Sequence, residues 1–332
     1  MYKKSVISAM LVCLLALGLA RVSKVDEYSQ DLRVHFIDVG HGDCIFIMTP
    51  NDTVKDNDRW DGHRILIDAG DEGTGTRYII PYLESLGMSD GDTIDWVILT
   101  HAHEDHLGGM PEIYGKYQVM NTVDPGYYYN SEAYRTFRAC AVAEPESDTW
   151  FDPLESELID SLGDTIGLGN ELEMQILHSK PAHSGNPNKT SIVLRLRYGD
   201  VSFLFMGDAE GKDREDDASA VKYVERTLVK TFGPALRSTV LKVGHHGSET
   251  SATDTFLSLV APQYAVISAG RKHSLPDTTV IDRLVSADAK VWRTDSKDSK
   301  KSAGNAGGDD HILITTSGTL PPKVGKSPVK TR

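Results

Sequence analysis

Four side chains that can bind a metal ion lie within six residues, in the run His101-Ala-His103-Glu-Asp105-His106. The run follows an apolar segment, Trp-Val-Ile-Leu, which predicts a strand. Side chains alternate along an extended chain, so His101 and His103 can point to the same side. Imidazole nitrogens and carboxylate oxygens are donors that zinc accepts. A single ion cannot easily use all four donors at this spacing, so the run predicts two cations that share them.

Further candidate ligands lie far from this run in the sequence. Asp208 ends the segment Phe-Leu-Phe-Met-Gly-Asp. His245 and His246 follow another predicted strand, in Gly-His-His-Gly-Ser, and either of them could be a ligand. An aspartate after glycine is often only a turn residue. These residues therefore become ligand candidates through their combination with the first run.

Together these segments resemble the metallo-β-lactamase superfamily, and most of all the metallo-hydrolase domain of ComEC-type competence proteins. The resemblance rests on the histidine run followed by Leu-Gly-Gly, on Val-His-Phe-Ile-Asp-Val-Gly-His-Gly-Asp near the start, on Asn188-Lys-Thr-Ser191, and on His-His-Gly-Ser. Asp68, at the end of Ile-Leu-Ile-Asp-Ala-Gly, resembles an early aspartate of the family. It extends in order over residues 32–317. It implies an α/β fold, the four-layer αββα sandwich, with the metals at one edge.

The resemblance also implies two metal sites that share one carboxylate. Zinc is the expected metal, with manganese as the alternative. Two such ions lower the pKa of a water molecule between them and supply hydroxide near neutral pH. Asp105 and Asp208 are expected to hold the metals and to orient that hydroxide. The implied ligands are His101 and His103 in site one, Asp105, His106 and His246 in site two, and Asp208 between the sites.

Some residues near this implied site depart from the family pattern. Many members have a further histidine for site one where this chain has Asn188 and Ser191, and the subgroup usually has glutamine where this chain has His41. These three residues are expected to contact the substrate. His273 resembles a late histidine near the substrate phosphate, which would donate a proton or hydrogen bond to the leaving oxygen. His245 is a further candidate for catalysis.

The expected function is therefore an exported, zinc-dependent phosphodiesterase or nuclease. Its substrate would be extracellular DNA or a phosphodiester of the cell wall. A β-lactamase, lactonase or thioesterase on the same fold is one alternative, and a noncatalytic surface binding module is another. The net charge of -13 weakens nonspecific attraction to nucleic acid. It does not exclude a nuclease, because bound cations can meet the phosphate.

The N-terminus predicts export to the medium or the cell surface. Lys3 and Lys4 precede an uncharged apolar run at 6–20, which is typical of a signal peptide and short for a membrane span. No membrane partner beyond such an anchor is expected, and the sequence indicates no oligomeric state. The predicted organisation is a signal peptide or anchor at 1–20, a linker at 21–31, the hydrolase domain at 32–317 and a disordered tail at 318–332.

Three other segments carry expectations that the structure can test. The charged stretch 213–231 predicts an amphipathic helix, and 121–160 predicts an insertion loop with some helix. The tyrosines at 127–129 are expected to pack on the core, with a role as the wall of a substrate cleft as the alternative. Cys44 is expected to be a buried free thiol, and a Cys44–Cys140 disulfide is the alternative in an exported protein.

Overall fold

The structure is a computed structural model. It describes residues 31–50, 62–145, 147–155, 158–169, 171–180, 185–270, 272–296 and 307–331. The predicted signal peptide and almost all of the predicted linker lie outside these residues. Among the helices of the described ranges, none has both the length and the hydrophobicity that crossing a bilayer requires.

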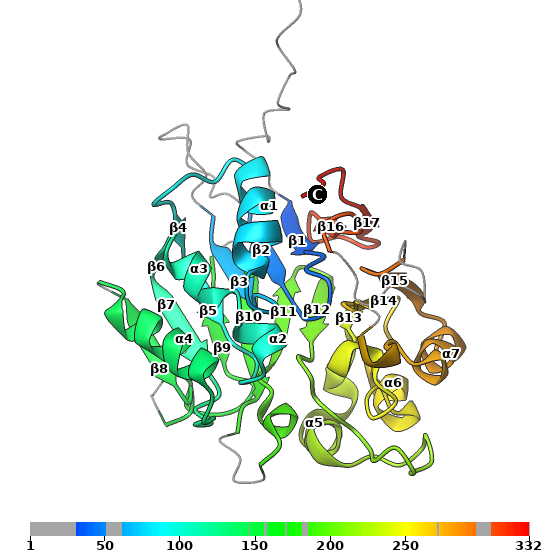
Figure 1. The fold of residues 1–332 in the computed structure, drawn as a ribbon. Helices are drawn as coiled ribbons and strands as arrows, with labels where there is room; N and C mark the ends of the chain where they lie inside the picture. Colours follow the sequence, from blue (N-terminus) through cyan, green and yellow to red (C-terminus); the bar gives the residue numbers. More distant parts are fainter. Residues whose placement is uncertain are drawn as a thin grey trace, which may run out of the picture.

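The first sheet has eight strands in the order β17-β16-β1-β2-β3-β5-β7-β8 (Figure 1). β1, β2 and β3 are antiparallel neighbours, whereas β3, β5, β7 and β8 run parallel. The strands are β1 (Leu32–Phe36), β2 (Ile45–Met48), β3 (Arg64–Ile67), β5 (Trp96–Ile98), β7 (Asn121–Asp124), β8 (Asp148–Phe151), β16 (Ile312–Thr316) and β17 (Lys323–Lys326).

The second sheet has seven strands in the order β15-β14-β13-β12-β11-β10-β9. β12 to β15 run parallel, and β9 to β12 are antiparallel. The strands are β9 (Thr165–Gly167), β10 (Leu172–His178), β11 (Val193–Tyr198), β12 (Val201–Phe205), β13 (Val240–Lys242), β14 (Tyr264–Ile267) and β15 (Lys290–Arg293); β4 (Thr93–Ile94) and β6 (Gln118–Val119) form a separate short sheet.

Three apolar cores hold four layers together. The largest lies between the two sheets and includes Phe36, Ile98 and Phe203. A second core joins the first sheet to its outer helices, and a third does so for the second sheet. The first layer contains η1 (Gly75–Ile79), α1 (Ile80–Ser85), α2 (Glu104–Leu107), α3 (Met110–Tyr114) and α4 (Glu132–Ala143); the last contains α5 (Tyr223–Phe232), α6 (Asp254–Val260) and α7 (Thr278–Ser286). The predicted αββα sandwich is confirmed.

The direction of the parallel strands determines where the candidate site residues lie. Asp68 follows β3 and His101 follows β5 in the first sheet, while Asp208 follows β12 and His246 follows β13 in the second. Carboxyl ends of parallel strands lie at the same edge of a sheet, where α/β proteins place their binding sites. The two sheets therefore bring residues that are far apart in sequence to one edge of the sandwich.

Three expectations about the elements are wrong. The segment 318–332 is not a disordered tail, because β17 pairs with β16 at the end of the first sheet and Val329 packs on the second core. The helix expected at 213–231 begins only at Tyr223, because the ammonium of Lys222 bonds to Asp213 and Asp216 and folds that stretch into a loop. The segment 121–160 contains the predicted helix, α4, but it is not an insertion loop, since β7 and β8 extend the first sheet. Both described cysteines are free thiols, and Cys44 is buried as predicted.

His35 generates a prediction about stability. Burial, with Arg33 and His311 adding to it, lowers the pKa of His35 from 6.5 to about 3. The unfolded chain thus takes up a proton near pH 6.5, while the folded chain does not until about pH 3. The free energy of unfolding should fall as the pH decreases through this window, by about 2 kcal/mol at pH 5 from this histidine alone.

Urea denaturation of a His35→Leu variant between pH 7 and pH 4 tests this. We expect a shallower loss of stability than in the unaltered chain. Tyr82→Phe is the control: its hydroxyl lies 3.0 Å from His35 Nδ1, but its removal leaves the imidazole buried. Tyr82→Phe should keep the original slope. An unchanged slope in His35→Leu would show that His35 is not the responsible group.

Candidate metal centre

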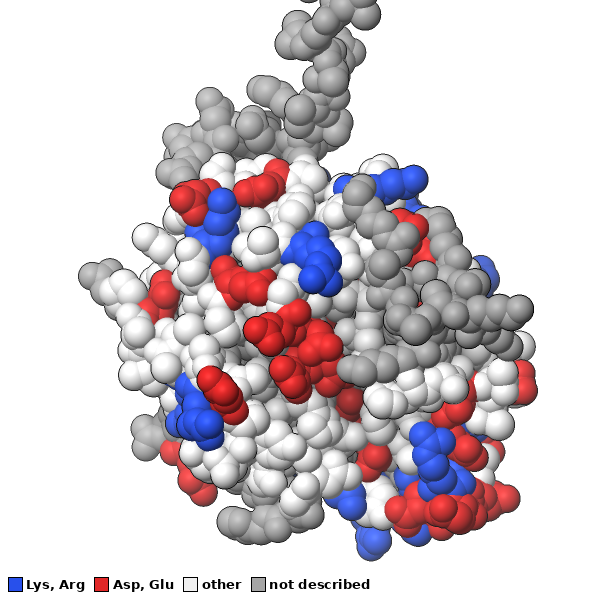
Figure 2. Space-filling view, viewed as in Figure 1, with Lys and Arg blue, Asp and Glu red and all other residues white. Residues whose placement is uncertain are grey.

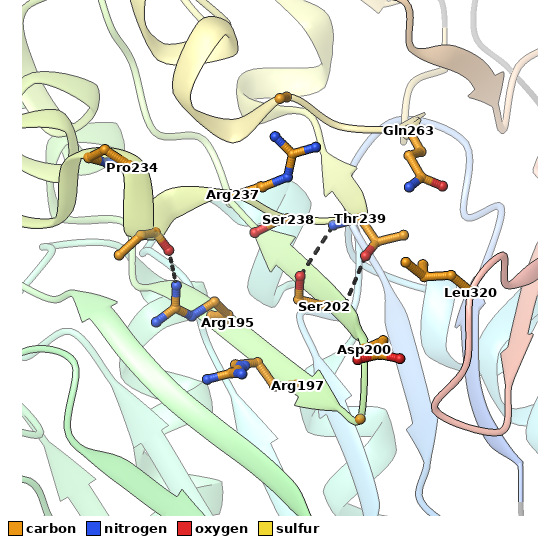
Figure 3. A pocket seen from close by; sticks show the side chains of 13 residues that line it. Arg195, Arg197, Asp200, Ser202, Pro234, Arg237, Ser238, Thr239, Gln263 and Leu320 are labelled. Atoms are coloured by element: carbon orange, nitrogen blue, oxygen red, sulfur yellow. Dashed lines mark hydrogen bonds between the residues drawn. The ribbon is translucent and has the colours of Figure 1, made fainter.

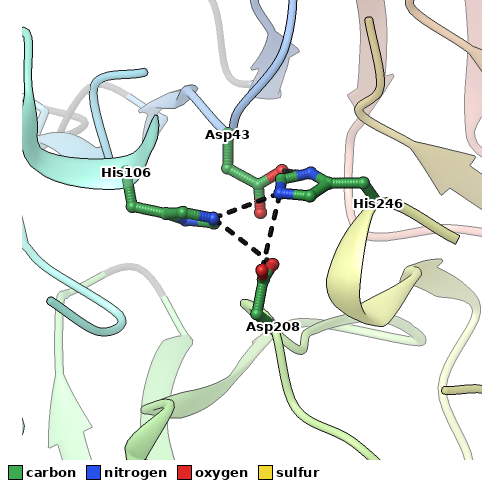
Figure 4. A group of neighbouring side chains, drawn as sticks. All are labelled: Asp43, His106, Asp208 and His246. Carbon is green, nitrogen blue, oxygen red and sulfur yellow. Dashed lines mark hydrogen bonds and ion pairs between the residues drawn. The ribbon is translucent and has the colours of Figure 1, made fainter. Parts of the chain in front are cut away.

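Two histidines and two aspartates meet at the edge of the sandwich (Figure 4). His106, His246, Asp208 and Asp43 each direct one ligand atom to a common point, and these atoms lie within 4.8 Å of one another. His106 Nε2 is 3.3 Å from His246 Nε2 and 3.3 Å from Asp208 Oδ1. All four residues are buried. Two imidazoles and two carboxylates with ligand atoms this close together form a donor set that suits a cation.

His106 is held in this orientation by Asp68. The Nδ1 of His106 donates to Asp68 Oδ2 at 2.8 Å, and Asp68 also accepts from the backbone and the hydroxyl of Thr100. A carboxylate on one ring nitrogen fixes the tautomer and directs the other nitrogen at the metal. Asp68 therefore positions a ligand, which is consistent with the early aspartate that the resemblance indicated.

A second group of ligand atoms contains His101, His103 and again Asp208. The Nε2 of His101 is 3.0 Å from His103 Nδ1 and 3.8 Å from Asp208 Oδ2. The opposite nitrogen of His101 lies 3.1 Å from the hydroxyl of Thr100, which itself bonds to Asp68. One hydrogen-bond network thus orients ligands in both groups. Asp208 belongs to both groups, as expected for a bridging carboxylate.

The structure distinguishes His246 from His245. Both residues have positive φ angles, 52° and 49°, but their rings have different partners, since His245 Nδ1 lies 3.1 Å from the hydroxyl of Thr250. His246 donates from Nδ1 to the carbonyl of Ser268 at 3.0 Å and presents Nε2 to the cluster. His245 lies outside the three candidate ligand groups, with Nε2 3.9 Å from Asp208 Oδ2. The geometry therefore selects His246 as the ligand and leaves His245 beside the bridging carboxylate.

Asp105 and His41 form a third group with His246. Asp105 Oδ2 is 3.2 Å from His246 Nε2 and 3.2 Å from His41 Nε2. The structure thus brings Asp105 into the centre, as predicted, and adds His41, which the sequence analysis considered only for substrate contact. His41 is therefore also a candidate ligand.

Asp43 was not predicted as a site residue. It lies in Val-Gly-His-Gly-Asp, a segment that the sequence analysis used only for the family resemblance. Gly42 has a φ of 116°, and a Cβ there would collide with the backbone carbonyl of Asp105. This close approach brings Asp43 into the cluster, where it forms an ion pair with the buried Lys242. Lys242 also donates to the carbonyl of Gly207, next to Asp208.

The electrostatics of the cluster favour cations. Burial raises the pKa of Asp43, but Lys242 and His246 outweigh burial and lower it below its usual value. Burial likewise opposes ionisation of Asp208, yet His246 and His106 hold its pKa well below the ordinary value. Burial lowers the pKa of His101 and keeps its ring neutral, as a metal ligand must be. Burial likewise lowers the pKa of His103. Burial opposes a charge on His106 and His246 too, but the carboxylates around them, Asp208 first, outweigh it and raise the pKa of both rings, that of His246 to about 10. The centre therefore combines ionised carboxylates with two neutral rings and two rings that hold protons, which bound cations would displace.

Polar atoms without hydrogen bonds support the same conclusion. Among the described residues, the buried Oδ1 atoms of Asp43, Asp208 and Asn188 accept no hydrogen bond. Buried polar atoms are almost always satisfied, so a group of orphans around one point indicates a ligand. The donor set of imidazole and carboxylate groups fits two zinc ions, and it would also fit manganese.

The residues predicted for the substrate side are only partly brought together. His273 is exposed, and its ring lies 5.6 Å from that of His41. Asn188 is buried beside His245, with Nδ2 3.3 Å from His245 Nε2. Ser191 is fully buried, and its hydroxyl accepts from the backbone N–H of Asp208 at 3.2 Å. Ser191 therefore supports the loop of Asp208 from its buried side, and its contact with substrate stays a prediction.

A separate cavity of about 510 Å³ lies away from this centre (Figure 3). Arg195 and Arg197, at consecutive outward positions of β11, line it together with Arg237 and Ser202. β12 leads from Ser202 to Asp208, six residues later, which corresponds to about 20 Å of extended chain. The cavity therefore belongs to the opposite end of the second sheet.

Comparison with known proteins identifies the family. Residues 60–271 match the model of the Metallo-beta-lactamase superfamily, so this chain belongs to that superfamily. The predicted resemblance is confirmed.

The curated relatives include three proteins whose names refer to competence or recombination. The chain is 27% identical over 290 residues to ComE operon protein 3 of Bacillus subtilis (strain 168), covering 80% of this chain and 32% of that protein. It is 28% identical over 264 residues to Competence protein ComA of Neisseria gonorrhoeae, covering 78% and 30%. It is 29% identical over 258 residues to Recombination protein 2 of Haemophilus influenzae, covering 76% and 26%. The chain thus spans about a third or less of the length of these relatives.

Lys242 generates a prediction about the metal-free protein. It is a buried cation within a cluster of carboxylates, and its loss leaves Asp43 with His246, at 3.4 Å, as its remaining ionic partner. Lys242→Met should lower the free energy of unfolding by about 3–5 kcal/mol when a chelator is present. Added zinc should raise the melting temperature of this variant more than that of the unaltered chain, because the cations replace the lost charge.

The control is Lys212→Met. Lys212 is equally buried, but its ammonium donates to the carbonyls of Asp213 and Asp216 outside the cluster. This variant should show the same zinc-induced shift as the unaltered chain. Equal shifts in the Lys242 and Lys212 variants would contradict the role of Lys242 as a compensating charge.

Proposed function

We propose that this chain is a two-metal phosphodiesterase, with zinc as the expected metal, that hydrolyses nucleic acid. The observation that carries this proposal is the position of Asp208, which belongs both to the group of His101 and His103 and to the group of His106 and His246. A carboxylate shared by two adjacent ligand groups suits paired cations about 3.5–4 Å apart, an arrangement common in enzymes that hydrolyse phosphate esters.

The residues around the centre have different roles in the proposed reaction. When bound, two cations supply a hydroxide nucleophile near neutral pH and stabilise the charge that develops on the phosphate. Asp105 and Asp208 orient the nucleophile from both sides. His273, exposed beside His41, protonates the leaving oxygen. Asn188 and His245, which are in contact with each other, orient the substrate next to Asp208.

The relatives support DNA as the substrate, since their names refer to competence and recombination. The surface charge supplies little of the attraction. The net charge is -13, and acidic side chains gather near α2 in the middle of the face shown in Figure 2. Binding of a polyanion would therefore depend on the cations of the centre rather than on a basic surface. A phosphodiester of the cell wall is the other substrate considered.

Asp208→Asn tests the assignment. Asparagine keeps the shape of the side chain but removes the charge that two cations share. We expect the metal content to fall below the two ions per chain of the unaltered protein. The rate of cleavage of bis-p-nitrophenyl phosphate should fall by about a thousandfold, which corresponds to the several kcal/mol that metal stabilisation supplies.

Asp200→Asn is the matched control, because Asp200 is exposed at the β11–β12 turn. This variant should retain both metal and turnover. The same preparations are assayed with DNA, RNA, a phosphocholine ester, nitrocefin and a thioester. Turnover of nitrocefin or the thioester without turnover of any phosphodiester would overturn the proposal, as would an unaltered protein that binds no metal and cleaves nothing.

Export is part of the proposal and rests on the sequence of residues 1–20. We expect the protein to be found in the medium or at the cell surface, with cleavage after Ala20. N-terminal sequencing of the mature protein would then begin at Arg21. A protein that retains Met1 at the cell surface would instead indicate an uncleaved anchor, and accumulation inside the cell would contradict export.

A further inference from the structure

Three consecutive tyrosines, Tyr127 to Tyr129, lie on the loop that follows β7. β7 runs parallel to β5, with Val123 opposite Ile98. The loops after these two strands therefore leave the same edge of the first sheet, and the loop after β5 carries His101 and His103. The topology places the tyrosines beside the metal centre.

The tyrosines point in different directions. The ring of Tyr129 lies 6.1 Å from that of His103 at an interplanar angle of 84°, and the ring of Tyr127 lies 6.2 Å from Tyr129 at 33°. Tyr128 instead contacts Tyr134 of α4, with ring centroids 6.3 Å apart. Tyr129 and Tyr127 thus form a row of two rings that begins at His103, which we call the tyrosine row.

The tyrosine row lies on the open side of the centre. His101 and His106 are fully buried, whereas His103 and Asp105 are partly exposed, so solvent reaches the cluster from their side. Tyr129 packs against the second core with part of its ring, as the sequence analysis expected, yet it stays partly exposed. Core packing therefore covers only part of the aromatic surface of the row.

The hydroxyl groups of Tyr127 and Tyr129 are a second indication that the row faces a ligand rather than the core. Among the described residues, no hydrogen bond fixes the hydroxyl of Tyr127 or Tyr129. Tyr134, by contrast, is buried and donates to Asp124 at 2.8 Å. A tyrosine that serves the core usually finds a partner for its hydroxyl, as Tyr134 does. The row instead presents aromatic surface to whatever enters the centre.

We propose that the tyrosine row is a stacking platform for unpaired bases of a single-stranded nucleic acid whose phosphate enters the metal centre. This inference rests on the proposed phosphodiesterase function. Every base has an aromatic face, so stacking supplies affinity without sequence preference. Base faces are covered in a duplex, so the platform favours single strands. Stacking also compensates for the weak electrostatic attraction of a strand to a chain with a net charge of -13.

A quaternary ammonium group, as in choline, is the other ligand that aromatic rings recognise. Such a cation is best held by rings that face one another around it. Tyr127 and Tyr129 are inclined by only 33° and lie in a row, which suits successive bases better than a single cation. Choline recognition is therefore an outcome of the test below.

The experiment compares oligothymidylate with an oligomer of equal length whose sugars carry no bases. Tyr129→Ala should lower kcat/KM for oligothymidylate by about tenfold, through KM, and leave the abasic oligomer unchanged. The Kd for oligothymidylate, measured by fluorescence anisotropy with the metals bound and with a phosphorothioate backbone that resists cleavage, should weaken by a similar factor. Tyr129→Phe and Tyr129→Trp should bind as the unaltered chain does, because both retain an aromatic ring.

Tyr128→Ala is the matched control, since Tyr128 belongs to the same loop, is 61% exposed and faces α4 instead of His103. It should change neither measurement. Equal losses on both oligomers in Tyr129→Ala, or a loss confined to p-nitrophenyl phosphorylcholine, would overturn the platform. Lack of cleavage of both oligomers by the unaltered chain would contradict the phosphodiesterase function instead, and the anisotropy measurement would still decide whether Tyr129 stacks with bases.

Discussion

The repulsion between carboxylates at one buried point is the constraint on which the site depends. Asp43, Asp105 and Asp208 each lie within 3.5 Å of a ring nitrogen of the buried His246, and Asp68 lies behind His106. Charges of one sign are costly to bury together unless partners compensate them. The chain provides one lysine for this purpose, Lys242, and surrounds the remaining charge with imidazole donors. Divalent cations would neutralise the negative charge that remains in this cluster, and the surrounding fold holds its members at fixed positions.

The two-sheet architecture holds these side chains close together in spite of their repulsion. Each sheet contributes ligands from loops that follow parallel strands, so the positions are fixed by strand pairing rather than by the loops alone. The network from Asp68 through Thr100 to His101 then couples ligands of both groups. Because the core between the sheets is apolar and continuous, the two halves of the centre cannot separate without exposing it. The precision of the site is therefore a property of the whole sandwich.

Local spacing was enough to predict the first half of the site. The alternation of His101 and His103 along a strand end requires no tertiary information, and the family resemblance supplied Asp208 and His246. The role of Asp43 was not predictable in this way, because a Gly-Asp pair is typical of a turn and only the close approach of Gly42 to Asp105 reveals its position. His245 and His246 are adjacent and identical in type, so the resemblance could only favour His246, and the contacts of the two rings distinguish them.

The pairing of β1 with β16 has a consequence for how such a domain is used. The first and the penultimate strands of the fold are antiparallel neighbours, with Leu32 opposite Thr316 (Figure 1). β17 lies directly beyond β16, so the first and last strands of the described residues are about 10 Å apart in one sheet. A fold whose ends are this close can be inserted into a loop of another protein with little distortion of either partner. Its metal centre is built from loops after other strands, so such an insertion would leave the centre intact. This sandwich is therefore suited to act as a transferable module in chains of very different length.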